Sequence, residues 1–145
     1  MVKENTKVAE ISVSYRPAVA NKPIVISSLH AYLIFKPFFD DSPINLQESF
    51  MVMYMNGMSR ILGVYPMYIG EMTGTVADIR LIFSVALTIS FTSVLQAHNH
   101  PSGNMKSSKG DIDLTKRIKD AGKLLDIKLL DHLIISPADR EHQLL

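Results

Sequence analysis

The chain has 145 residues, 47% of them hydrophobic and 20% charged, which is the length of one domain and the composition of an ordered globular protein. It contains no cysteine, so disulfides and thiolate metal sites are excluded, and any transition-metal site must use His, Asp or Glu. The formal net charge of +1 argues against the broad basic face of a nucleic-acid-binding protein.

The sequence contains no segment that indicates a membrane or secretion. No apolar run reaches the roughly 18 residues of a membrane span. The N-terminus lacks the basic start and the apolar stretch of a signal peptide. We therefore expect a cytoplasmic protein with no membrane partner.

The first 44 residues predict one strand and one short helix. Apolar and polar residues alternate over residues 8–15, as in a half-buried strand, which would end at Arg16-Pro17. Ser27 and Ser28 are candidate caps of a short helix that would end near Pro37. This region is expected either to be part of the main domain or to pack on it.

Residues 45–145 predict the main domain, which begins with a hairpin. The run 48–56 is rich in Met and aromatic residues, Asn56-Gly57 is a hairpin-turn signal, and residues 61–69 supply the partner strand. Met51, Met53 and Met55 alternate along the first strand, so they would share one face and belong to the core.

Two helices and two further strands follow the hairpin. Apolar residues recur at helical spacing over 78–90 and again over 114–125. Residues 93–98 predict a short strand that ends in the polar loop Pro101-Ser102-Gly103, and residues 128–135 predict the last strand. Strands and helices alternate without a repeat or a linker, which indicates a single α/β domain.

The residues that could carry chemistry are concentrated between positions 98 and 111. In an extended strand, residues two apart lie on the same side about 6.6 Å apart, so His98 and His100 can bind one metal ion. Asp111, at the predicted start of the second helix, can reach back across the loop as a third ligand. Two imidazoles and a carboxylate suit zinc and leave the fourth tetrahedral position for water, as a catalytic site requires.

Each part of this pattern also has an ordinary structural explanation. Ser108-Lys109-Gly110-Asp111 fits the Ser-x-x-Asp pattern that caps many helices, and a lone His-x-His pair is a weak metal signal. The joint spacing of the two parts favours the metal-site interpretation. This spacing is His98-x-His100, seven residues, Ser108, two residues, Asp111.

That spacing resembles the JAMM motif of the JAB1/MPN family of zinc isopeptidases, which is His-x-His, seven residues, Ser, two residues, Asp, with a Glu upstream. The flanking residues resemble the bacterial RadC branch of that family, over about residues 45–136. Three stretches carry this resemblance: Thr75-Val76-Ala77-Asp78-Ile79-Arg80, Ala97-His98-Asn99-His100-Pro101-Ser102-Gly103 and Leu129-Leu130-Asp131-His132-Leu133-Ile134-Ile135.

The resemblance implies a mixed sheet flanked by helices, a fold related to that of the cytidine deaminases. It also implies a zinc metallohydrolase, a peptidase or isopeptidase with a peptide or protein substrate, in which His98, His100 and Asp111 hold the Zn²⁺. Glu48 matches the upstream Glu and would be the general base. Ser108 would hydrogen-bond near the bound water or the reacting carbonyl. Without the resemblance, Glu48 would be taken for a solvent-facing residue at a strand end.

Two other functions stay open at this point. The name RadC suggests a DNA-repair-associated accessory protein, and the wider MPN family includes non-catalytic scaffolds. The helix-hairpin-helix region of longer RadC proteins has no counterpart in the first 45 residues, so nucleic-acid binding is not expected without an added domain. A zinc deaminase is excluded because its site needs cysteines. The sequence indicates neither the substrate nor the oligomeric state.

One further pair near the predicted last strand has two interpretations. Asp131-His132 could orient a metal ligand from the second coordination sphere. A buried structural histidine is the commoner explanation for such a residue. His30 and His142 lack metal-like spacing and are expected to be ordinary surface or packing residues.

Overall fold

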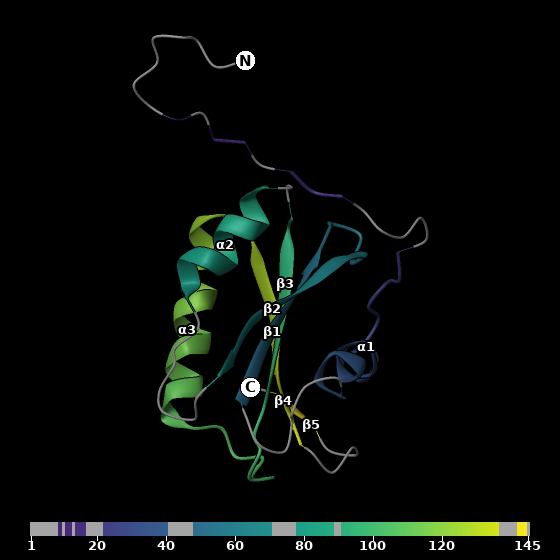
Figure 1. Ribbon diagram of the computed structural model, residues 1–145, viewed down its shortest axis with the longest axis vertical. Coiled ribbons are helices and arrows are strands. Elements are labelled where there is room, and N and C mark those ends of the chain that lie inside the picture. Colours follow the sequence, from purple (N-terminus) through teal and green to yellow (C-terminus); the bar gives the residue numbers. More distant parts are fainter. Residues whose placement is uncertain are drawn as a thin grey trace.

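The computed structural model describes residues 9, 11–12, 14–16, 22–40, 48–70, 78–88, 91–136 and 142–144. Within these residues, three helices and five strands form three layers, with the sheet in the middle (Figure 1). None of the helices described is both long and apolar enough to cross a membrane. The elements are α1 (Ser28–Asp40), β1 (Glu48–Met55), β2 (Ile61–Gly70), α2 (Ile79–Thr88), β3 (Ser93–Asn99), α3 (Lys109–Leu124), β4 (Lys128–Ile135) and β5 (His142–Leu144).

The sheet has the strand order β2-β1-β3-β4-β5 and is mixed, as expected. β3 and β4 run parallel, whereas the other three neighbouring pairs are antiparallel. Parallel neighbours need a crossover connection, and α3 supplies it between β3 and β4. The loop before α3 therefore begins at the end of a central strand.

Helices cover both faces of the sheet, so the inner strand β1 is buried on both sides. α2 and α3 lie on one face and α1 lies on the other (Figure 1). Phe50, Val52 and Tyr54 belong to the core on the α2–α3 side. The predicted stripe of Met51, Met53 and Met55 is confirmed as core and packs on the α1 side.

The predicted N-terminal strand is wrong at every described position of residues 8–15. None of these positions lies in a strand, and Ile11 is 87% exposed. A strand is stable only where neighbouring backbone groups can pair with it, and alternation alone does not supply a neighbour. Tyr15 still reaches the domain, because its hydroxyl donates a hydrogen bond to the carbonyl oxygen of Leu62 at 2.5 Å.

The first helix was predicted to end near Pro37, and this prediction is also wrong, because α1 continues to Asp40 with Pro37 inside it. Proline in a helix interior costs about 3 kcal/mol. The additional turn buries Phe39 completely and places its ring 6.5 Å from that of Phe35. Burial of one such side chain contributes about 1.5–3 kcal/mol, which offsets at least half of the cost of the proline.

The hairpin and the two later helices form as predicted. Asn56 organises the turn between β1 and β2, because its Oδ1 accepts hydrogen bonds from the backbone N–H groups of Met58 and Arg60. Asp78 begins α2 by accepting from the backbone N–H of Arg80 at 2.9 Å. The fifth strand, which pairs with the end of β4, was not predicted.

Gly122 is expected to be indispensable to the packing of α3 against the segment that follows it. Its carbonyl accepts from the N–H of Ile127 at 2.8 Å, and a Cβ at this position would lie 2.2 Å from the Ile127 carbonyl oxygen. Gly122→Ala should therefore destabilise the protein by about 1–3 kcal/mol, as overpacking does elsewhere. Urea denaturation curves measure the loss.

Gly110→Ala is the matched control, because Gly110 lies in the first turn of the same helix and an added Cβ there would meet only Ser108 Oγ, at 3.6 Å. Alanine at this position should leave the free energy of unfolding unchanged or raise it by up to about 1 kcal/mol. Equal stability of the two variants would contradict the role assigned to Gly122.

Candidate metal centre

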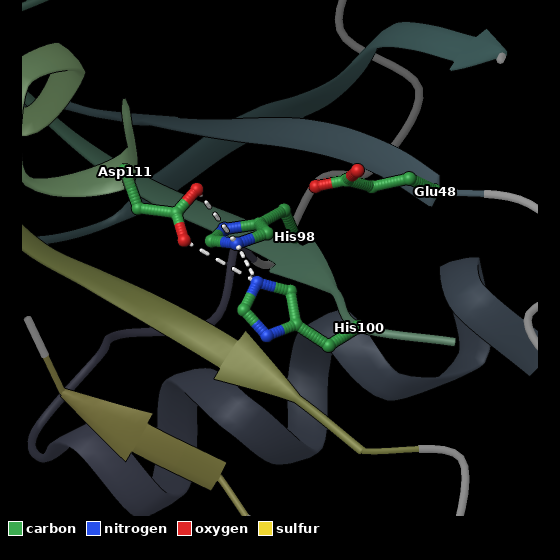
Figure 2. Close-up of side chains that lie close together, drawn as sticks. All are labelled: Glu48, His98, His100 and Asp111. Atoms are coloured by element: carbon green, nitrogen blue, oxygen red, sulfur yellow. Dashed lines mark hydrogen bonds and ion pairs between the residues drawn. The ribbon is translucent and has the colours of Figure 1, made fainter. Parts of the chain in front are cut away.

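Three separate elements bring the four predicted metal-site side chains together. His98 is the second-last residue of β3, and His100 directly follows that strand. Asp111 lies in the first turn of α3, and Glu48 is the first residue of β1. One potential ligand atom from each of the four lies within 4.8 Å of the others. Figure 2 shows the Asp111 carboxylate and both imidazoles pointing toward one another, with the Glu48 carboxylate directed at the same group.

The position of Glu48 follows from the pairing of β1 with β3. In this antiparallel pair Phe50 lies opposite His98, so the residues before Phe50 run past the end of β3. Asn99 extends the pairing with its side chain, because its Oδ1 accepts from the Ser49 backbone N–H at 2.6 Å. Glu48 is therefore held beside the His98–His100 segment, although fifty residues separate them in the chain.

The donor set and its spacing fit a zinc ion. His98 Nε2 lies 3.4 Å from Asp111 Oδ1, and His100 Nε2 lies 3.4 Å from Asp111 Oδ2. The two Nε2 atoms are 2.8 Å apart. Ligands at 2.0–2.1 Å from a tetrahedral ion are roughly 3.3–3.4 Å from one another. Each imidazole is at this spacing from one oxygen of the Asp111 carboxylate, while the two imidazoles would need to separate slightly.

The charges of the centre favour a cation. Burial alone would raise the pKa of Asp111, but its contacts with the imidazoles of His100 and then His98 outweigh that effect and hold this pKa well below its usual range. Asp111 is therefore ionised at neutral pH. A hydrogen bond with Asp111 is also the main cause that raises the pKa of His100. The imidazole of His100, which would otherwise bind a metal ion, therefore binds a proton readily.

The loop fixes which nitrogen of His100 faces the centre. His100 Nδ1 lies 2.6 Å from the carbonyl oxygen of Asn104. Because a carbonyl only accepts hydrogen bonds, Nδ1 must carry the proton. A neutral His100 therefore presents the lone pair of Nε2 to Asp111 and His98, which is the form that binds a metal ion.

Ser108 caps α3, as one of the two sequence interpretations predicted. Its Oγ accepts from the Asp111 N–H at 3.0 Å, and Asp111 Oδ2 accepts from the Ser108 N–H at 2.7 Å, which together form a capping box. The Asp111 carboxylate thus belongs to the cap and to the centre at once, so capping and metal binding are compatible. The role of the exposed Ser108 hydroxyl near a substrate stays a prediction.

The structure adds two residues to the centre: His132, for which a second-sphere role was one of the two sequence interpretations, and Thr115, which the sequence analysis did not single out. His132 of β4 is fully buried, and its Nε2 lies 2.6 Å from His98 Nδ1. Burial first, and then the neighbouring His98, lowers the pKa of His132 to about 3. Thr115 lies one turn after Asp111 in α3, with its Oγ1 2.6 Å from His132 Nδ1. That spacing from Asp111 was the only sequence signal for Thr115.

The predicted Asp131-His132 pair does not act as a unit. Asp131 Oδ1 accepts from the backbone N–H of His132, and its Oδ2 accepts from the Ser28 hydroxyl at the start of α1. Only His132 contacts a predicted metal ligand. The two neighbours therefore face opposite layers of the fold, because successive residues of a strand point to opposite sides of the sheet.

Zinc affinity is expected to fall as the pH drops through the pKa of His100. A ligating imidazole must be neutral, so zinc and a proton compete for Nε2. The hydrogen bond with Asp111 raises the pKa of His100 above its ordinary value of 6.5, so competition begins above that pH. Below this pKa, the logarithm of the affinity should fall by about one for each pH unit. Chelator competition between about pH 5.5 and 8.5 measures the profile, and a flat profile would contradict this prediction.

Comparison with known proteins shows the family of the chain. A family model described as "RadC-like JAB domain" matches residues 25–142. A UPF0758 protein of Flavobacterium johnsoniae is 38% identical over 112 residues, which is 77% of this chain and 48% of the relative. A UPF0758 protein of Porphyromonas gingivalis is 38% identical over 111 residues, again 77% of this chain and 48% of the relative.

A third relative shows the same relation over a shorter region. A UPF0758 protein of Thermosynechococcus vestitus is 42% identical over 92 residues, which is 63% of this chain and 37% of the relative. The chain thus spans less than half the length of these curated relatives. The names of these relatives state no activity. The predicted domain boundary at residue 45 stays a prediction, and the match to the family begins at residue 25.

Proposed function

The chain belongs to the RadC-like JAB domain family, and from that premise we propose that it is a zinc-dependent metallohydrolase, a peptidase or isopeptidase. The observation that carries the proposal is the convergence of Glu48, His98, His100 and Asp111, whose potential ligand atoms lie within 4.8 Å of one another. His98, His100 and Asp111 would hold the zinc. Glu48 would stay free for proton transfer.

A zinc ion in this position supplies Lewis-acid chemistry, since it lowers the pKa of a coordinated water toward about 7 and polarises a carbonyl oxygen. The residues of the chain supply the remaining requirements. Asp111 contributes a negative charge that is held by the cap of α3, and the two imidazoles contribute neutral nitrogen donors from a buried strand end. The donors come from rigid elements, which keeps the site pre-organised.

Glu48 is the proposed general base. Its carboxylate is close enough to the ligand group to accept a proton from the attacking water and then to pass that proton to the leaving amine nitrogen. Asn99 keeps this carboxylate in place by binding the backbone of the next residue, Ser49, at 2.6 Å. A peptide or an isopeptide bond has the amine leaving group that this proton transfer requires.

Metal analysis and an assay of amide hydrolysis together test the proposal. Protein prepared with zinc should contain about one zinc per chain, and His100→Ala should contain almost none. The zinc-loaded protein should cleave bonds in a mixture of peptides or in glycyl-lysine isopeptides, with new termini detected by mass spectrometry. A chelator should abolish the cleavage and added zinc should restore it.

Each other outcome of the experiment has a definite meaning. Wild-type protein that carries no more zinc than His100→Ala would overturn the metal centre. Stoichiometric zinc without cleavage of either substrate would overturn the hydrolase proposal and favour a non-catalytic scaffold. Salt-sensitive binding of duplex DNA in a gel shift would favour the DNA-associated alternative.

A further inference from the structure

A chain of hydrogen bonds, buried at His98 and His132 and partly buried at Thr115, runs behind the metal centre from the ring nitrogen of His98 that faces away from Asp111. It passes from His98 Nδ1 to His132 Nε2 at 2.6 Å, and from His132 Nδ1 to Thr115 Oγ1 at 2.6 Å. It continues from Thr115 Oγ1 to the backbone carbonyl oxygen of Asp111 at 2.7 Å. The chain thus begins at one predicted zinc ligand and ends at the backbone of another.

The carbonyl at the end of this chain fixes the direction of every proton in it. The Asp111 carbonyl can only accept, so the single hydroxyl proton of Thr115 is donated to it. Thr115 Oγ1 must then accept from His132, which places a proton on His132 Nδ1. The partners of His132 are an imidazole and a hydroxyl, so a second proton would create a buried charge that neither partner compensates. His132 Nε2 therefore accepts, and the proton between the two rings belongs to His98 Nδ1.

We propose that His132 and Thr115 are positioning residues that fix the tautomer of His98, so that its Nε2 lone pair faces the metal position. This inference rests on the proposed zinc centre but not on hydrolysis. Metal-binding histidines usually donate their second N–H to a carboxylate, a backbone carbonyl or water. Here a neutral histidine is the acceptor, and it is itself oriented by a hydroxyl on the helix that carries Asp111.

The arrangement also connects His98, the predicted ligand on β3, with Asp111, the predicted ligand on α3. His98 Nε2 lies 3.4 Å from Asp111 Oδ1, while the hydrogen-bond chain returns from His98 Nδ1 to the backbone of the same Asp111. β3, β4 and α3 each contribute one part of this closed path. The ring of Phe50 packs against both His98 and His132, at centroid distances of 6.3 and 5.6 Å, and limits rotation of either ring.

Thr115→Val is the most direct test, because valine has nearly the same shape and lacks the hydroxyl. Without that acceptor, the proton on His132 is free to move to Nε2 and the His98 tautomer is no longer fixed. Zinc affinity, measured by chelator competition, should fall 10–100-fold, the range found for second-sphere partners of metal sites. His132→Leu should lower it at least as far, and Thr115→Ser should restore it to within about threefold of wild type.

Thr88→Val is the matched control. Thr88 Oγ1 donates to the carbonyl oxygen of Ser84, four residues earlier in α2, as Thr115 does to Asp111 in α3. The control therefore removes the same kind of helix hydrogen bond away from the metal centre. It should leave zinc affinity unchanged, so a loss confined to Thr115→Val cannot be attributed to helix destabilisation.

Nitrogen-15 NMR of the zinc-free protein at pH 8 reads the tautomer directly. Wild type should show a protonated Nδ1 and an unprotonated Nε2 for His98, and Thr115→Val should show a mixture of the two tautomers. A wild-type His98 protonated mainly on Nε2, or a folded Thr115→Val with unchanged tautomer and zinc affinity, would overturn the proposal. If wild type bound no zinc, the proposed function would fail, while a fixed Nδ1–H tautomer would still support the role of His132 and Thr115.

Discussion

Replacing Glu48 with glutamine is expected to lower kcat/KM for amide hydrolysis by about 10²–10⁴-fold while the protein keeps its zinc. Glutamine preserves the size of the side chain and its ability to accept a hydrogen bond. It cannot take up a proton from water and return it to the leaving amine. Because Glu48 is not counted among the three zinc ligands, the variant separates proton transfer from metal binding.

Three measurements on the same preparation check this expectation. Zinc content and the thermal unfolding midpoint should match those of wild type, and only the rate of cleavage should fall. Asp113→Asn is a suitable control, because it neutralises an exposed carboxylate of α3 that lies outside the metal centre. Full activity in Glu48→Gln with normal zinc content would refute the general-base role.

Replacing Asp111 with asparagine is expected to weaken zinc binding by more than about 100-fold, because loss of even a second-sphere partner costs 10–100-fold. The amide oxygen can still accept the hydrogen bond from the Ser108 N–H, so the cap of α3 is largely preserved. The negative charge that attracts the cation is lost. The effect is therefore one of metal affinity rather than of helix formation.

Stability in the presence of zinc reports the same loss independently. Zinc at 100 times its Kd should raise the free energy of unfolding of wild type by about 2.7 kcal/mol. The same concentration should give almost no increase in Asp111→Asn. Asp113→Asn makes the same chemical change two residues along the helix, at an exposed position, and should behave as wild type. Equal stabilisation of both variants by zinc would show that Asp111 is not a ligand.

Most of the secondary structure was predictable because a helix or strand with one buried face has apolar residues at a regular spacing in the sequence. β1, β2, β3, β4, α2 and α3 all follow from apolar spacing and turn residues. The two wrong predictions lie near the N-terminus, and β5 near the C-terminal end was not predicted. Pro37 predicted a helix end, but burial of Phe39 extends α1 beyond it. Residues 8–15 have the alternation of a strand, and the described ones find no neighbouring strand.

The residues of the candidate centre also differ in whether local sequence patterns predict them. His98, His100 and Asp111 are close in sequence, so their spacing on a strand end and a helix start predicted that they can converge, while the site role of Ser108 came from the family resemblance. Glu48 was found only through a family resemblance, because nothing in its own surroundings distinguishes it. The register of β1 against β3, which no local pattern reveals, is what brings it to the centre.

The sequence by itself determined the local chemistry of this protein: two imidazoles two residues apart, a carboxylate at a helix start, and no thiolate to compete with them. The tertiary structure decided the partners that orient those groups. His132 and Thr115 come from a neighbouring strand and from the crossover helix, and only their packing against His98 gives them a role. Local spacing fixes which ligands can converge, whereas hydrogen bonds between distant elements determine which nitrogen of each imidazole faces the metal position.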